Sequence, residues 1–586
     1  MSAASGGRRR PAGTSGRKRS ARVGRFLALL VLLILALLAV SGRLVQIQMI
    51  DGPAYAAAAA DQRTREIEIS AERGFIFDRD GEVLAESVGA RTVYAVPGSV
   101  IDKEGVARTI ADTLGGDEAD YLQRLRRDAT FVYLARKADA GRAATLENLG
   151  IGGLGFIEDS RRVYPSNELA CQVLGFVGVD DAGLSGIELF YDELLTGEAG
   201  RLIGERDTRG RPIPGGVTYE VEALNGKNIV LTIDKDIQYQ AQVALAEAVA
   251  ETEATAGSVL VMDPKSGEIL AMASVPAFDP NRFGNSDQEA YRNRSVVDIY
   301  EPGSTMKAFT AAAVLEEGLF TPESTFDLPP TLTVGGRTIR EATRRERVSY
   351  TLTEIIRYSS NIGSAMMAEK LGPKGLYGYL EAFGFTEPTG IDFPGEVRGR
   401  LAAPEAWSGS SLATIAFGQG IAVTPLQLAR GYAAIANGGE LVTPHLVREV
   451  PDAPELSLVW PKRRAVSTAT ADTVRSILTE AHAEGAGSLA EVQGYTVAGK
   501  TGTAQKPRTD GHAGYDPGKY VASFCGFLPA EDPRVLVLVV IDEPAGSYYG
   551  SQVAAPVFSR IASYCVEHLR IPPPTRVTGA AQSGDD

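Results

Sequence analysis

The sequence predicts an α+β protein in which one N-terminal membrane helix precedes a β-rich domain and a larger domain built on an antiparallel sheet with helices. Three observations lead to this prediction. An uncharged apolar run follows a basic leader, a glycine-punctuated region with short strand-like runs comes next, and strand-like runs then stand at both ends of a long helix-rich segment. With 586 residues, the chain also exceeds the size that one hydrophobic core serves.

The uncharged run lies between Arg25 and Arg43 and reads FLALLVLLILALLAVSG. A run of this length can cross a hydrocarbon core of about 30 Å once the flanking side chains snorkel, so we assign 26–45 to a transmembrane anchor. Residues 1–25 hold seven Arg, one Lys and no acidic residue, which places this basic tail in the cytoplasm and the body outside. A cleaved signal peptide is the alternative, because Ala39-Val40-Ser41 resembles a cleavage site. Both interpretations export the body.

The charge of the chain is uneven. Removing the eight positive charges of the tail from the total of −14 leaves −22 for the rest. An acidic body argues against nucleic acid as a partner.

Cysteine and histidine are rare. Cys171, Cys525 and Cys565 are interpreted as apolar filler, and Cys525 with Cys565 is the one pair that could share a domain and form a bridge. No His-x-x-x-His or Cys-x-x-Cys pattern occurs, so we expect neither a metal site nor a cofactor.

The β-rich domain is predicted at 60–222. It contains the strand-like runs TREIEI, GFIFDRDGEVLA and RTVYAVPG. Its centre, at about 103–150, is highly charged and is predicted to be helical.

The larger domain is predicted at 225–570. NIVLTI is interpreted as a buried strand, followed by a helix over 237–250, and GSVLVMD with GEILAMAS is predicted to form a hairpin. KYVASFCGF and RVLVLVVID are further predicted strands, and 555–569 has apolar residues at helical spacing. We expect one antiparallel sheet whose outer strands come from both ends of this domain, and a disordered tail at 571–586.

None of the four histidines stands in a recognisable catalytic setting, and we interpret them as solvated or capping residues. They are His445, His482, His512 and His568. A Ser-His-Asp hydrolase is therefore disfavoured, and a nucleophile needs another activating group.

Ser304-Thr305-Met306-Lys307 offers such a group. Pro302-Gly303 precedes it and an Ala-rich stretch follows, so Ser304 is predicted to open a helix with Lys307 one turn on, on the same face. In a buried site the pKa of lysine can fall enough for the neutral amine to accept a proton from serine. The motif alone is weak, because Ser15-Gly16-Arg17-Lys18 in the basic tail also fits it.

Two further elements strengthen the interpretation. Ser359-Ser360-Asn361 supplies a hydroxyl and an amide that can relay a proton and hold a peptide. Lys500-Thr501-Gly502-Thr503 lies in a strand-like run, where lysine and two hydroxyls suit a carboxylate and Gly502 is expected to let a substrate backbone approach closely. Ser-x-x-Lys, Ser-x-Asn and Lys-Thr-Gly in this order are the signature of penicillin-binding proteins and serine β-lactamases.

The sequence resembles class B penicillin-binding proteins over nearly its whole length, and within them the division-specific FtsI type. Besides the three motifs, the matching stretches are RGFIFDRDGEVLA (73–85), RRVYP (161–165), GLSGIE (183–188), LTIDKDIQ (231–238), YEPGSTMK (300–307) and AFGQGIAVTPLQLA (416–429). The resemblance implies a pedestal (dimerisation) domain at 60–222 and a serine β-lactamase/transpeptidase-like domain at 225–570. The first three stretches belong to the pedestal, where we expect them to serve as turns and salt bridges rather than in catalysis.

The resemblance also implies roles for the motif residues. Ser304 attacks the penultimate D-Ala of a stem peptide and Lys307 is its base, an assignment that relatives leave open between lysines. Ser359 passes a proton to the departing D-Ala, and Asn361 orients Lys307. The substrate carboxylate is bound by Lys500, Thr501, Gly502 and Thr503, and the backbone N–H groups of Ser304 and Thr503 form the oxyanion hole.

The implied function is a peptidoglycan D,D-transpeptidase of septal cell-wall synthesis that β-lactams acylate. Its implied partners are stem peptides, nascent glycan strands, the inner membrane, an FtsW-type glycosyltransferase and other divisome proteins, with the catalytic domain on the periplasmic side. Three alternatives stay open: an elongation-specific transpeptidase, a hydrolytic D,D-carboxypeptidase or β-lactamase, and a β-lactam-sensing or scaffold module.

Overall fold

The computed structural model describes residues 17–55, 64–69, 71–205, 218–456, 458–483, 488–508, 510, 512 and 514–574. Most of the basic tail and most of the tail predicted to be disordered lie outside these residues. The chain divides into two compact units, one of residues 1–70 and 199–224 and the other of residues 71–198 and 225–586.

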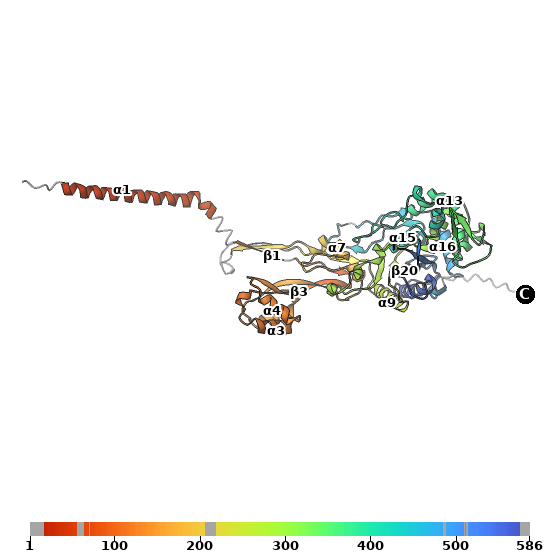
Figure 1. Ribbon diagram of the computed structural model, residues 1–586, viewed down its shortest axis with the longest axis horizontal. Coiled ribbons are helices and arrows are strands. Elements are labelled where there is room, and N and C mark those ends of the chain that lie inside the picture. Colours follow the sequence, from red (N-terminus) through yellow and green to blue (C-terminus); the bar gives the residue numbers. More distant parts are fainter. Residues whose placement is uncertain are drawn as a thin grey trace, which may run out of the picture. The chain divides into compact units, whose positions relative to one another are not determined.

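The first unit contains the apolar helix and a small sheet (Figure 1). Helix α1 (Arg17–Val45) continues in a π-helical turn, η1 (Gln46–Ile50). The segment Val23–Ile50, in which an 18-residue window has a mean hydropathy of 2.8, is long and apolar enough to cross a membrane. Strands β1 (Thr64–Ile69), β6 (Gly200–Glu205) and β7 (Thr218–Val221) pair antiparallel in the order β1-β6-β7, which confirms TREIEI as a strand.

In the second unit, one sheet joins strands on both sides of the predicted domain boundary near 222–225. Its order is β16 (Val447–Glu449), β8 (Ile229–Leu231), β2 (Ile76–Phe77), β3 (Val83–Ala95) and β4 (Val132–Asp139), and β5 (Leu154–Val163) also pairs with β3. Strand β8 runs parallel to β2, so backbone hydrogen bonds cross this boundary. Helices α3 (Lys103–Leu114), α4 (Glu118–Leu125) and α5 (Ala140–Asn148) supply the core packed against β3 and β4. The prediction of a helical centre at 103–150 is therefore confirmed for these helices and wrong for Val132–Asp139, which forms strand β4.

A buried charge network explains three of the stretches that resembled the family. Glu188 accepts hydrogen bonds from Arg73 Nε and Arg162 Nε, both at 2.7 Å, and from the Tyr164 hydroxyl at 3.2 Å. Arg73 also bonds Asp192 at 2.7 Å. Arg73, Arg162 and Glu188 come from RGFIFDRDGEVLA, RRVYP and GLSGIE, so these stretches meet as a salt-bridge cluster, as the sequence led us to expect.

The larger part of the second unit is built on a five-stranded antiparallel sheet. Its order is β10 (Ile269–Val275), β9 (Ala256–Met262), β20 (Val535–Asp542), β19 (Tyr515–Leu528) and β18 (Ala498–Pro507). The edge strands β10 and β18 come from opposite ends of the predicted domain, and the hairpin β9–β10 is present. The expected sheet is therefore confirmed.

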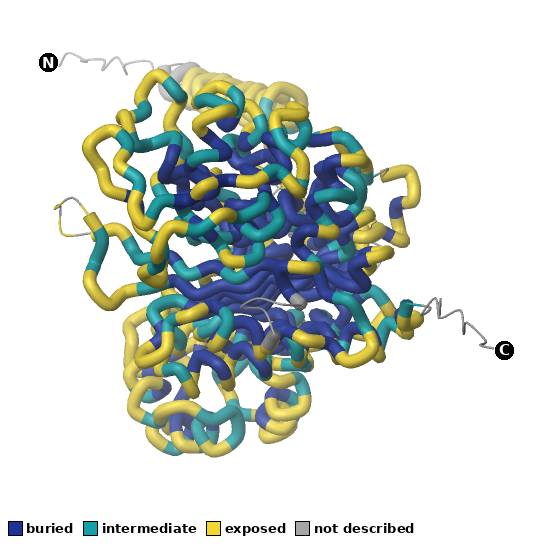
Figure 2. The backbone as a smooth tube through the Cα atoms, turned by 90° about the vertical axis from the view of Figure 1, so that its right-hand side faces the viewer, coloured by how far each residue is buried: buried dark blue, intermediate teal, exposed yellow. Residues whose placement is uncertain are grey.

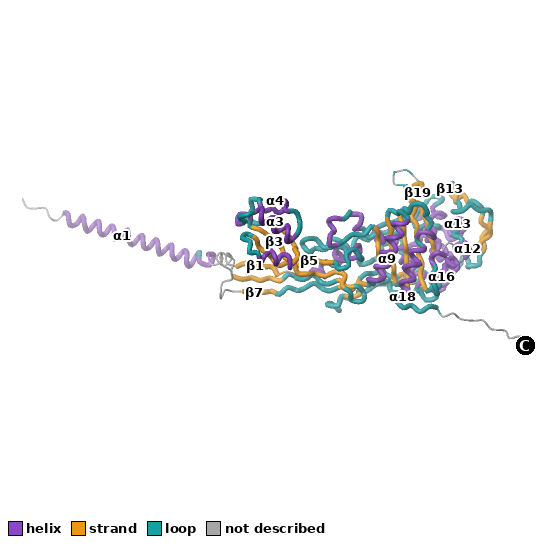
Figure 3. The backbone as a smooth tube through the Cα atoms, turned by 90° about the horizontal axis from the view of Figure 1, so that it is seen from below, coloured by secondary structure: helices purple, strands orange, loops and turns teal. Residues whose placement is uncertain are grey.

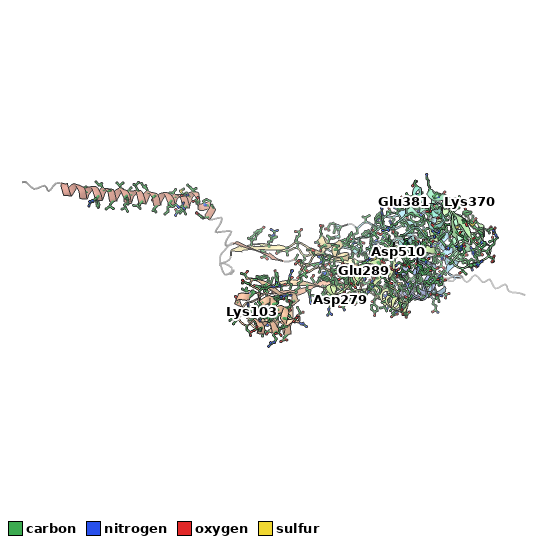
Figure 4. All side chains as sticks on the ribbon, viewed as in Figure 1. Lys103, Asp279, Glu289, Lys370, Glu381 and Asp510 are labelled. Atoms are coloured by element: carbon green, nitrogen blue, oxygen red, sulfur yellow. The ribbon has the colours of Figure 1, made fainter. Side chains whose placement is uncertain are left out.

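Helices cover both faces of this sheet. In Figure 1, α9 (Lys235–Glu251) lies on one side of the sheet and a helical layer lies on the other, and α18 (Ala555–His568) packs beside α9 (Figure 3). That layer contains α11 (Lys307–Glu316), α13 (Asn361–Ala382), α15 (Pro425–Ala436) and α16 (Thr468–Ala483). Because both faces are covered, β9 is buried along its whole length, and the buried segments gather in the middle of the unit in Figure 2. Helix α13 faces solvent at Lys370 and Glu381 (Figure 4).

Short elements complete the second unit. The helices are α6 (Cys171–Leu174), α7 (Gly186–Phe190), α8 (Asp192–Thr196), α10 (Arg294–Val297), α12 (Leu352–Arg357), α14 (Ser411–Ile415) and α17 (Gly550–Val553). The strands are β11 (Thr325–Leu328), β12 (Leu332–Val334), β13 (Arg337–Ile339), β14 (Val348–Thr351), β15 (Glu440–Leu441) and β17 (Arg463–Arg464), and the 3-10 turns are η2 (Pro97–Ser99), η3 (Pro280–Asn285), η4 (Gln288–Tyr291), η5 (Gly303–Met306), η6 (Pro404–Ala406) and η7 (Ser488–Ala490).

The cysteines and histidines are placed as follows. All three cysteines are free and buried, so Cys525 and Cys565 form no bridge. Our interpretation of solvated histidines is wrong for His445 and His482, which are buried and pack against Trp460 and Phe524. Burial lowers the pKa of both imidazoles.

Candidate active site

A cleft of about 610 Å³ brings together residues that lie far apart in the sequence. Its wall includes Ser304, Ser359, Asn361, Thr501 and Thr503. These residues come from the turn before α11, the junction of α12 with α13, and strand β18. The three motifs therefore converge on one site, as their order in the sequence predicted.

The turn that carries Ser304 is held by a second glycine-containing loop. Gly303 has φ +55° and donates its N–H to the Gly418 carbonyl at 3.1 Å. A Cβ on Gly418, whose φ is +86°, would lie 2.1 Å from the Gly303 carbonyl oxygen. Only glycine fits this contact, which explains why AFGQG accompanies YEPGSTMK. Ser304 then lies in the 3-10 turn η5, and α11 begins at Lys307, so the predicted one-turn separation is present.

Lys307 is fully buried and bridges two motifs. Its Nζ donates to the Ser359 hydroxyl at 3.1 Å, the Ser359 carbonyl at 2.5 Å and Asn361 Oδ1 at 2.8 Å. Among the described residues, no hydrogen bond joins Ser304 to Lys307. Hydrogen bonds of this kind often tighten only when substrate is bound, so the arrangement is compatible with proton transfer.

The site lowers the proton affinity of both lysines. Burial lowers the pKa of Lys307 well below its ordinary value, the Lys500 ammonium lowers it further, and Glu341 opposes them. Burial also lowers the pKa of Lys500 to about 8. A buried lysine beside a second cation can serve as a neutral amine base.

Ser359 is held in a strained backbone conformation. Its φ is +56°, in the left-handed region, which costs a residue with a side chain about 1–3 kcal/mol. The next residue, Ser360, caps helix α13 by accepting the Gly363 N–H at 2.9 Å. This turn directs the Ser359 hydroxyl and carbonyl at Lys307.

Strand β18 forms another wall of the cleft at the edge of the sheet. Thr501 and Thr503 line the cleft, while Lys500 is buried behind them with Nζ 3.4 Å from Thr501 Oγ1. An edge strand leaves one row of backbone groups free to pair with an extended peptide. The arrangement suits a peptide that ends in a carboxylate.

Gly502 has a packing role that the sequence did not show. A Cβ there would lie 2.3 Å from Ser523 Oγ and 3.0 Å from the Pro302 carbonyl oxygen. The packing of the protein itself therefore requires glycine at 502, and the approach of a substrate backbone there stays a prediction. The glycine lets β18 pack against the turn that carries Ser304, because alternate residues of a strand point to opposite faces.

Several wall residues were not found from the sequence. Tyr520 and Tyr548 stack at 4.0 Å on one wall, and Tyr350 and Tyr358 stack at 4.9 Å on the other. Glu341 and Arg345 also line the cleft. These residues stand in four separate segments, and no motif spacing connects them; the only sequence signal was the charged run TIREATRRERVSY.

Family models of penicillin-binding proteins match most of the chain. The model of the penicillin binding protein transpeptidase domain matches residues 257–563, and that of the penicillin-binding protein dimerisation domain matches residues 68–231.

Individual relatives align over most of their length. The chain is 34% identical to peptidoglycan D,D-transpeptidase FtsI of Escherichia coli (strain K12), covering 95% of this chain and 93% of that protein. It is 34% identical to stage V sporulation protein D of Bacillus subtilis (strain 168), covering 94% and 86%. Penicillin binding protein 3 of Mycobacterium tuberculosis, solved in complex with aztreonam, aligns with a TM-score of 0.67 at 29% identity, covering 87% and 98%.

Proposed function

Because this chain belongs to the class B penicillin-binding proteins and is a serine-type peptidoglycan D,D-transpeptidase, we propose that it cross-links stem peptides of the septal wall through an acyl-enzyme on Ser304. The observation that carries the site assignment is the buried Lys307, whose Nζ lies within 3.1 Å of the Ser359 hydroxyl in the same cleft as Ser304.

In the proposed acylation step, neutral Lys307 accepts the proton of Ser304 Oγ while this oxygen attacks the carbonyl carbon of the penultimate D-Ala. The carbonyl oxygen becomes an oxyanion, which the backbone N–H groups of Ser304 and Thr503 stabilise. The peptide bond then breaks. Lys307 returns a proton through Ser359 to the departing amine of the terminal D-Ala.

In the second step, an amine from a neighbouring stem peptide attacks the ester. It loses a proton to the Lys307–Ser359 pair, and Ser304 leaves with a proton restored. Lys500, Thr501 and Thr503 bind the terminal carboxylate of the donor before acylation, and Gly502 holds their strand in place.

A fluorescent penicillin tests the nucleophile. Wild-type protein is expected to be labelled covalently, and Ser304→Ala is expected to abolish labelling while the thermal unfolding curve is retained. Labelling of the alanine variant would reassign the nucleophile. Rapid release of hydrolysed penicillin by wild type would favour the hydrolytic alternative instead.

The septal assignment draws support from the likeness to FtsI and from Asn361 and the stretch FGFTEPTGIDFPGE, which resemble division enzymes. Depletion of the protein is expected to give filamentous cells, whereas rounded cells would favour elongation. Complementation by Ser304→Ala would support the scaffold alternative.

A single-pass membrane protein fits the apolar helix Val23–Ile50. The basic residues before it support a cytoplasmic tail and a catalytic domain on the periplasmic side. The proposed partner in the membrane is an FtsW-type glycosyltransferase within the divisome. Ala28, Ala36 and Ala39 support helix contact, because small residues permit close packing in lipid.

Replacing residues 26–42 by an unrelated span of equal length tests this contact, with Arg25 and Arg43 kept. Acylation by penicillin is expected to survive, whereas co-purification with the polymerase and rescue of division are expected to fall. Full rescue of division by the replaced span would show that the helix serves only as a membrane anchor.

A further inference from the structure

A carboxylate outside the three motifs binds the N-terminus of helix α13. Glu341 follows strand β13, and its side chain is 7% exposed. Its Oε2 accepts the backbone N–H of Asn361 at 2.7 Å, and its Oε1 accepts the Ser360 hydroxyl at 2.6 Å and the Ile362 N–H at 3.4 Å. Three consecutive residues at the helix N-terminus are thus bound to one side chain.

The same segment fixes the side chain of Asn361. Asn361 Nδ2 donates to the Arg340 carbonyl at 3.0 Å, which leaves Oδ1 to accept from Lys307 Nζ at 2.8 Å. The Asn361 amide is therefore held in one orientation, with its oxygen toward Lys307 and its nitrogen toward Arg340. Residues 340 and 341 together determine where the acceptor for Lys307 lies.

Arg345 holds Glu341 in place. Its Nη2 donates to Glu341 Oε1 at 2.5 Å and to Ser360 Oγ at 3.1 Å, and its guanidinium lies 4.7 Å from the centre of the Tyr350 ring. Burial favours the neutral acid, but the hydrogen bonds from Ser360, the Asn361 N–H and Arg345 outweigh it and lower the pKa of Glu341. Glu341 is therefore an anion that interacts favourably with the N-terminus of α13.

The hydrogen bonds of Glu341 lie next to a strained part of the backbone. Ser359, directly before the bound residues, has the strained φ of +56°, and a strained residue persists only where its surroundings hold it. Lys307 bonds both Ser359 and Asn361, so any movement of the turn changes the position of Nζ.

We propose that Glu341 is a positioning residue for acylation, which holds Ser359 and Asn361 around Lys307 through its hydrogen bonds to the start of α13. This inference rests on the proposed function of Ser304 and Lys307. It assigns to the segment between β13 and β14 a role in the reaction that the three motifs do not contain.

The charged groups that face Lys307 come from strand β18 and from the loop after β13. Lys500 on β18 disfavours the protonated amine, and Glu341 favours it. Removing the charge of Glu341 while keeping its size is therefore expected to lower the pKa of Lys307 further. The neutral base then persists to lower pH.

The test uses the full-length protein and the second-order rate of acylation by a fluorescent penicillin. Glu341→Ala is expected to lower this rate about a hundredfold, since misplacing a reacting group by about 1 Å can cost that much. Glu341→Asp should recover part of the rate, and Glu341→Gln should move the acidic limb of the pH–rate profile to lower pH. Glu346→Ala is the matched control, because Glu346 is exposed in the same segment and lies outside the cleft wall.

Unfolding curves give the folded fraction of each variant, so that acylation rates can be expressed per folded molecule. A rate lost through misplaced groups is then separated from a rate lost through unfolding. The proposal fails if Glu341→Ala acylates at the wild-type rate, or if Glu341→Gln leaves the acidic limb unmoved. An unlabelled wild type, or a labelled Ser304→Ala, would instead overturn the proposed function itself. The two failures are thus distinguishable.

Discussion

Replacing Lys500 by methionine is expected to stabilise the protein and slow the enzyme. Lys500 is 5% exposed, and burial lowers the pKa of its ammonium from 10.5 to about 8. Between these two pH values the unfolded chain therefore binds more protons than the folded chain. The destabilisation of the fold by the charged lysine grows as the pH falls through this range and is complete below about pH 8. The gap corresponds to about 3 kcal/mol at pH 7. Methionine has similar length and no charge, so we expect the free energy of unfolding to rise by about 1–3 kcal/mol.

Acylation is expected to move the opposite way. Loss of a charge-assisted contact to the substrate carboxylate should cost about 1.5–3 kcal/mol, or roughly tenfold to a hundredfold in rate. Lys500 also contributes to the low pKa of Lys307, after burial. In Lys500→Met the pKa of Lys307 therefore rises, and the acidic limb of the pH–rate profile moves to higher pH, the reverse of the shift expected for Glu341→Gln.

Two measurements check this prediction: thermal unfolding at pH 7, and the rate of acylation by a fluorescent penicillin across the pH range. Lys506→Met is the matched control on the same strand, because Lys506 is 31% exposed and its ion pairs with Asp542 and Glu543 lie outside the cleft wall. This control should leave acylation unchanged and cost at most about 1 kcal/mol. A lower melting temperature for Lys500→Met with an unchanged rate per folded molecule would refute the reasoning and make Lys500 a structural residue.

Two further changes test the buried charge network of Glu188 and the close packing at Gly502. Glu188→Ala leaves two buried arginines without their shared partner and is expected to cost about 3–5 kcal/mol in urea unfolding, whereas Glu193→Ala, exposed on α8, should change stability by about 0.5 kcal/mol or less. Equal stabilities of the two variants would contradict the network. Gly502→Ala places a Cβ 2.3 Å from Ser523 Oγ and should lower the acylation rate at least about tenfold, with partial recovery in the double variant Gly502→Ala/Ser523→Gly. An unaffected rate in Gly502→Ala would show that β18 tolerates the shift.

Local patterns determined much of this protein from its sequence. The apolar run predicts a membrane helix because a span needs only length and low charge. Lys307 follows Ser304 by one helical turn because side chains three residues apart share a face, whatever surrounds them. The buried runs of β9 and β20 predict strands because both faces of the sheet are covered, so apolar residues need not alternate.

The tertiary structure decided which distant residues meet. Glu188 was visible only as part of a stretch expected to form turns and salt bridges, and its partners were not, because the two arginines that reach its carboxylate lie more than twenty residues away. Gly502 was correctly placed in a motif, but its packing role was not visible, since the atoms that exclude a side chain belong to Ser523 and Pro302. Glu341 escaped notice because it meets Asn361 only once two separate segments fold together. Periodicity and spacing record neighbours along the chain, whereas burial, charge and close packing depend on neighbours in space, and those are set only when the sheet and its helices assemble.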